Sequence, residues 1–140
     1  MAYLLAALGG ALGALARWGV ATALPHDPGG WPWATLLVNL TGCLLIGVLL
    51  AVLLSRFPAS NWARPFLAVG VLGGYTTFST FAVEVVRSVE VGAGLIAAGY
   101  LLTSVLGGVA CVVLGLVGAR AVLRPAETAL EDLEAGEDQT

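Results

Sequence analysis

Four long apolar segments divide the chain and predict four membrane-spanning helices. They run from Ala2 to Leu24, from Ala34 to Leu54, from Pro65 to Val89 and from Val91 to Val122. Each is long enough to cross a hydrocarbon core of ~30 Å, which takes about 20 helical residues. The loops PHDPGGWPW and FPASNWARP separate the first three segments, and a short hinge separates the last two. The pattern predicts an all-α integral membrane protein.

Composition supports placement in a membrane. Of the 140 residues, 59% are hydrophobic and 11% are charged, and the mean hydropathy is +0.94. A soluble domain carries about 25% charged residues, so we expect a multi-pass protein of the cell membrane, surrounded by lipid. The chain has no lysine, and its six arginines form no basic patch. Nucleic acid is therefore excluded as an expected partner.

The chain ends in a segment of different character. From Arg124 onward it is acidic and has no aromatic residue. Such a composition favours disorder. We therefore expect a transmembrane domain over residues 1–123 and an acidic tail over residues 124–140. The tail is either a short amphipathic piece or disordered, and we expect disorder at its end.

Arginine positions indicate the orientation only weakly. With four spans, four arginines fall on the membrane side shared by both termini and two on the other side. The first group is Arg56, Arg64, Arg120 and Arg124, and the second is Arg17 and Arg87. This bias favours cytoplasmic termini. A bias this small is also typical of a protein that inserts in both orientations.

Polar residues inside the apolar segments gather in three clusters. The clusters are Thr35, Asn39 and Thr41 in the second segment, Thr76, Thr77, Ser79 and Thr80 in the third, and Tyr100, Thr103 and Ser104 in the fourth. Polar groups in hydrocarbon are expected to face protein or a water-filled path. These are hydroxyls and one amide, which donate hydrogen bonds without carrying charge. Neutral donors suit a small, strongly hydrated anion whose water must be replaced.

Charged and catalytic chemistry is poorly represented in the spans. Glu84 and Glu90 lie toward the end of the third segment. Glu84 precedes Arg87 by three residues, which favours a local ion pair. Cys43 and Cys111 sit in apolar runs and are interpreted as packing residues. Because no catalytic cluster, nucleophile elbow or phosphate loop is present, the sequence predicts that the protein is not an enzyme.

Two features of the third segment leave alternatives open. Phe78 and Phe81 flank the hydroxyls, and their positively polarised ring edges suit contact with an anion. The residues alone favour the plainer alternative, in which both rings pack against lipid or neighbouring helices. Gly73-Gly74 either pack closely or break the helix. A break at membrane depth is tolerated only where it lines a cavity or binds an ion.

Three motifs resemble those of the Fluc/CrcB family of fluoride channels. They are GGALGALAR (Gly9 to Arg17), TLLVNLTG (Thr35 to Gly42) and GGYTTFSTF (Gly73 to Phe81), which occur in the family's order. The resemblance covers nearly all of residues 5–123. It implies a fluoride-selective channel that passively exports fluoride and so relieves its toxicity. It further implies a third helix broken near its middle and an antiparallel, dual-topology homodimer with two pores along the subunit interface.

The resemblance also implies roles for individual residues. Those of the fluoride pore are Asn39, Phe78, Phe81, Ser79, Thr80, Tyr100, Ser104 and Arg17. The backbone carbonyls of Gly73 and Thr76 are implied to hold a structural Na⁺ at the dimer interface. For Arg17, snorkelling to the membrane surface stays open as an alternative. The path beyond Ser104 is also open, because Thr103 lies about 100° round the helix.

Two other functions were weighed against this one. A small multidrug-resistance-type transporter is also a compact four-helix protein, but it depends on a glutamate in its first helix, and this first helix has none. A membrane-embedded assembly subunit would use its glycine faces only for packing. The hydroxyls of the third segment argue against that role, because packing does not need them.

Overall fold

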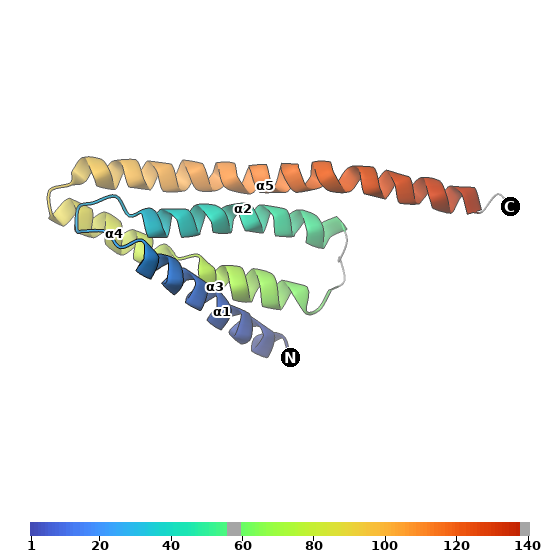
Figure 1. Ribbon diagram of the computed structural model, residues 1–140, viewed down its shortest axis with the longest axis horizontal. Helices are drawn as coiled ribbons and strands as arrows, with labels where there is room; N and C mark the ends of the chain where they lie inside the picture. The colour runs from blue at the N-terminus through green and yellow to red at the C-terminus, as the bar shows by residue number, and fades with distance from the viewer. Residues whose placement is uncertain (56–59, 138–140) are drawn as a thin grey trace.

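The chain folds into a bundle of helices. The structure, a computed structural model, describes residues 1–55 and 60–137, with side chains as far as Leu123. The elements in chain order are α1 (Ala2–Ala23), α2 (Trp33–Ser55), η1 (Arg64–Leu72), α3 (Gly73–Tyr75), α4 (Phe78–Glu90) and α5 (Gly94–Glu137). In Figure 1, α2 and α5 lie side by side and α1 crosses the third span.

Four helical stretches in the described part are long and apolar enough to cross a membrane. They are Ala2–Ala23, Trp33–Ser55, Arg64–Glu90 and Gly94–Leu123. Each end lies within three residues of the end predicted from sequence. The prediction of an all-α membrane protein with four spans is thereby confirmed.

The last helix is longer than predicted. Its backbone continues past the expected end near Val122 to Glu137, and Figure 1 shows it extending beyond the other helices. The sequence left a short amphipathic piece or disorder open for this tail, and its alanine, leucine and glutamate are strong helix formers. Residues 138–140 and Arg56 lie outside the described residues, and the division of the chain at residue 123 stays a prediction.

Glycines let α1 and the first half of the third span approach closely. Gly9 and Gly13 of α1 face Gly70 and Gly74, and both pairs are four residues apart. A methyl group on Gly13 would collide with the carbonyl of Val71, and one on any of the other three would collide with facing backbone too. The crossing is therefore made by backbone against backbone, as the GxxxG pattern predicts.

A second glycine crossing joins α2 to α5. A methyl group on Gly47 would collide with the backbone of α5, and one on Gly115 with the backbone of α2. Farther along the same two helices, Leu36, Val38 and Tyr100 form part of the buried core. The second half of the third span, α4, packs against α5. The two halves of one span thus belong to different helix pairs.

Large apolar side chains cover the outside of the bundle. Leu8, Trp18, Leu106 and Leu114 are each more than half exposed. An apolar surface of this extent is unfavourable in water and is typical of contact with lipid or with another protein. This surface agrees with the four predicted spans.

Candidate functional site

The third span is interrupted at Thr76 and Thr77. Both residues are extended, with φ −75° and ψ 156° at Thr76 and φ −147° and ψ 125° at Thr77. The break predicted from sequence is confirmed, but Gly73 keeps helical angles of −65° and −34°. The glycines are used for contact with α1, where Gly74 meets Gly10. The extended backbone falls instead on β-branched threonines, which favour it.

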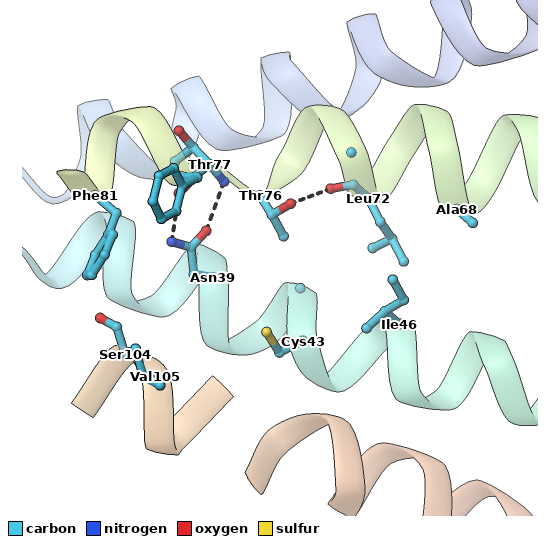
Figure 2. Close-up of a pocket in the computed structure, with 13 residues that line it drawn as sticks. Asn39, Cys43, Ile46, Ala68, Leu72, Thr76, Thr77, Phe81, Ser104 and Val105 are labelled. Carbon is cyan, nitrogen blue, oxygen red and sulfur yellow. Dashed lines mark hydrogen bonds between the residues drawn. The ribbon is translucent and has the colours of Figure 1, made fainter. Parts of the chain in front are cut away.

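Asn39 holds the interrupted backbone from the neighbouring helix α2. Its Oδ1 accepts a hydrogen bond from the Thr77 N–H, and its Nδ2 donates one to the Thr77 carbonyl, both at 2.9 Å. Figure 2 shows this paired contact. Broken helices leave backbone groups that need new partners at membrane depth. Asn39 supplies a partner for both polar groups of Thr77.

Thr77 also begins the second half of the span. Its Oγ1 accepts a hydrogen bond from the Thr80 N–H at 3.2 Å and donates one to Thr80 Oγ1 at 3.0 Å. This is the N-cap arrangement that threonine favours at a helix start. Ser79 Oγ lies 3.3 Å from the same hydroxyl. The positive end of the α4 dipole thus carries three hydroxyl groups.

The carbonyl groups of Gly73 and Thr76 are among those that lose their helical partners at the break. In a continuous helix the Gly73 carbonyl would accept from the Thr77 N–H, and the Thr76 carbonyl from the Thr80 N–H. Those two N–H groups donate instead to Asn39 and to the Thr77 hydroxyl. Backbone carbonyl oxygens are ligands that replace the hydration shell of hard monovalent cations. The residues with the implied cation role therefore have suitable donor atoms.

The first cavity has a volume of about 430 Å³ and lies between α2, α5 and the third span. Asn39, Phe78, Phe81 and Ser104 line it, as do Gly73 and Thr76. The two phenylalanine rings lie 6.0 Å apart between centroids. Ser104 Oγ is buried and has no hydrogen-bond partner among the described residues. The cavity combines neutral donors with aromatic rings.

A second cavity of about 280 Å³ adjoins the start of α4. Arg17 of α1 and Thr35 of α2 line it, together with Thr77 and Thr80. The Nε atom of Arg17 is buried and has no partner in the described part of the chain. Thr77 lines both cavities, so the break contributes to each of them.

Two of the predicted pore residues lie outside both cavity linings. Ser79 is exposed at the start of α4. Tyr100 is 0% exposed, and its ring packs behind Phe81 at a centroid distance of 5.1 Å. The structure thus brings six of the eight predicted pore residues to the two cavities, and Tyr100 packs behind one that lines the first cavity.

Glu84 makes contacts that the sequence did not predict. Its Oε1 accepts a hydrogen bond from Thr35 at 2.8 Å, and its Oε2 accepts one from Tyr100 at 2.7 Å. The carboxylate therefore joins α2, α4 and α5, and the interpretation of a local ion pair with the exposed Arg87 is wrong. Helical spacing carried a signal, because Phe81, Glu84 and Ser88 recur on one face of α4.

Comparison with known proteins places the chain in a family. Residues 4–116 match the model described as CrcB-like protein, Camphor Resistance (CrcB). The chain is similar to "Fluoride-specific ion channel FluC 2" of Nocardia farcinica, with 50% identity over 113 residues and 81% of each chain covered. The protein named "Fluoride-specific ion channel FluC" in Hyphomonas neptunium is 49% identical over 122 residues, which is 86% of this chain and 96% of that one.

The protein of the same name in Bordetella petrii is 48% identical over 120 residues, which is 86% of this chain and 92% of that one. The family match over residues 4–116 includes all three motifs and the residues named above as lining both cavities. With four spans, a broken third helix and matches of this extent, the chain belongs to the CrcB family.

Proposed function

We propose that this chain is a fluoride-selective ion channel that passively exports fluoride across the cell membrane. The observation that carries the proposal is the cavity lined by Asn39, Ser104, Phe78 and Phe81, in a chain whose relatives named as fluoride channels match most of its length. The chain is a multi-pass membrane protein and not an enzyme. Its ligand is an anion that must be stripped of water.

Neutral donors offer the replacement for that water. Arg17 at the second cavity supplies the attraction that draws an anion toward the membrane interior. The second cavity also contains the Thr80 hydroxyl, at the positive end of α4. The first cavity then offers the Asn39 amide and the unpartnered Ser104 hydroxyl. The hydroxyls and the amide donate hydrogen bonds without the fixed charge that would trap the ion.

The phenylalanine pair supplies the aromatic part of the anion route. Phe78 and Phe81 lie at an interplanar angle of 45°, so their edges are offset. Ring edges carry partial positive charge. They contact an anion weakly, which permits it to leave again, as conduction requires.

Passive transport needs no coupled ion. Hydrogen fluoride enters a cell as a neutral acid and dissociates, and the negative-inside potential then drives the anion outward at ~2.3 kcal/mol per 100 mV. The alternative, a small multidrug-resistance-type transporter, needs a carboxylate in its binding site. Neither cavity has one among its described lining residues, and that alternative is not favoured.

The working unit is a homodimer of oppositely oriented subunits. Phe78 is 80% exposed in the single chain although it lines the first cavity. A second copy would cover this ring and close the cavity, and a two-fold interface would form two such pores. Labelling of single cysteines in the two end loops tests the orientation, and reaction from only one side of the membrane contradicts it.

A structural Na⁺ belongs at the centre of that dimer. The carbonyl oxygens of Gly73 and Thr76, released from helical bonding, are the ligands this chain offers, and two subunits would supply four. The ion supplies a fixed positive charge between the two broken helices.

Efflux from liposomes tests the function. Purified protein is reconstituted into vesicles loaded with fluoride, and efflux is followed with a fluoride electrode. We expect rapid fluoride efflux and little chloride efflux under the same conditions. Absence of efflux, or equal passage of chloride, contradicts the proposal. Dependence of transport on a proton gradient would favour the transporter.

A further inference from the structure

We infer that Asn39 is a positioning residue for the cation site, in addition to lining the anion cavity. The inference rests on the Na⁺ site proposed above and deepens it. Asn39 lies on α2, whereas the carbonyl groups concerned belong to the third span. The side chain acts on them through the backbone of Thr77, which it holds at 2.9 Å by both polar groups.

The two halves of the amide have separate consequences. Oδ1 takes up the Thr77 N–H, which is the group that a continuous helix would direct to the Gly73 carbonyl. The Gly73 oxygen is thereby kept available. Nδ2 carries two N–H groups, and the Thr77 carbonyl accepts one of them. The second remains for the cavity that Asn39 lines.

Without the Asn39 Oδ1 acceptor, the helix would be free to continue through Thr77. Thr77 is 9% exposed, so its N–H has little access to water and must find another partner. The Gly73 carbonyl, four residues earlier, is the partner that ordinary helix geometry offers. A helix continued through Thr77 would take one carbonyl from the cation site of each subunit, without any change in the residues that carry those carbonyls.

One side chain thus connects the anion route with the cation site. The acceptor of Asn39 serves the cation site, and its donor serves the anion. A residue that only lined the pore would have no influence on cation binding. This difference makes the inference testable on the purified protein without a transport assay.

The test measures melting temperature with Na⁺ as the probe. Purified protein is heated in NaCl and in N-methylglucamine chloride at equal ionic strength. For the unchanged chain we expect Na⁺ to raise the melting temperature by roughly 4 °C or more at saturation. Absence of that rise contradicts the proposed Na⁺ site itself and leaves the fluoride channel function in place.

Three variants then separate the roles. Asn39→Leu keeps the approximate shape of the side chain and removes its polar atoms, and we expect the rise with Na⁺ to disappear. Asn39→Asp keeps the acceptor for the Thr77 N–H, and we expect the rise to remain. Ser104→Ala, the matched cavity-lining control, should also keep it.

The inference is overturned if Asn39→Leu responds to Na⁺ as the unchanged chain does. If Asn39→Leu gives no folded protein, Asn39→Ala, which also lacks the acceptor, takes its place. Loss of the Na⁺ response in folded Asn39→Ala supports the inference. A response like that of the unchanged chain overturns it, as does loss of the response in folded Asn39→Asp, which keeps the acceptor.

Discussion

The first half of the third span, from Arg64 to Tyr75, packs against α1 through backbone, whereas the second half, from Phe78 to Glu90, packs against α5 through side chains. Gly70 and Gly74 leave no room for even a methyl group at the first contact. At the second, Phe81 and Glu84 meet Tyr100. The first half fixes position, and the second presents functional groups.

This difference explains why the break lies where it does. A rigid, close-packed helix ends at Tyr75, and a hydroxyl-capped helix begins at Phe78. At this junction the last carbonyl groups of the first helix and the first N–H groups of the second have no helical partners. If the two halves have separate tasks, substitutions in the first should affect folding and those in the second should affect flux.

The largest effect is expected in the glycine contact. Gly13→Ala places a methyl group against the carbonyl of Val71, where only backbone movement relieves the collision. We expect a loss of about 3 kcal/mol of stability, seen as a lower melting temperature and less monodisperse protein. Gly19→Ala on the same helix meets nothing within 4 Å and should be neutral. Equal behaviour of the two variants would contradict the close crossing.

A large effect on flux alone is expected in the second half. Phe78→Ile removes the exposed aromatic edge, and fluoride efflux should fall by about a hundredfold, or ~2.7 kcal/mol of barrier. The dimer should elute unchanged on size-exclusion chromatography. Val86→Ile, also exposed and on the same helix, is the control. If Phe78→Ile conducts at nearly the rate of the unchanged chain, the Phe78 ring does not take part in the pore.

An intermediate effect is expected from the carboxylate that braces the aromatic pair. Glu84→Gln leaves one acceptor oxygen for the two hydroxyls of Thr35 and Tyr100. Tyr100 then loses part of its support behind Phe81, and efflux should fall roughly tenfold, since an unmet buried hydrogen bond costs ~1–3 kcal/mol. Glu90→Gln changes the same charge at the exposed end of the helix and should conduct normally. Similar rates in both variants would contradict the bracing role.

Sequence reasoning predicted the spans because lipid imposes a simple length and polarity rule on each helix. For Gly73-Gly74 the residues alone left close packing and a break both open, since threonines after two glycines make a poor helix interior. The break itself was implied by the family resemblance. Sequence reasoning could not place the break, since the contact of Gly74 with Gly10 depends on how two distant helices cross. For the same reason it paired Glu84 with a near neighbour in the chain, whereas both donors come from other helices.

The smallest effect on efflux is expected from substitution of Ser104. This substitution should change efflux without changing the melting temperature. The Ser104 hydroxyl is buried and has no hydrogen-bond partner among the described residues, so its removal breaks no internal bond. Ser104→Ala should therefore melt at the same temperature as the unchanged chain. If the hydroxyl donates to fluoride in passing, losing one neutral hydrogen bond should lower efflux roughly threefold, because such a bond is worth ~0.5–1.5 kcal/mol. A lower melting temperature with unchanged efflux would assign Ser104 to packing and end the anion route at Asn39.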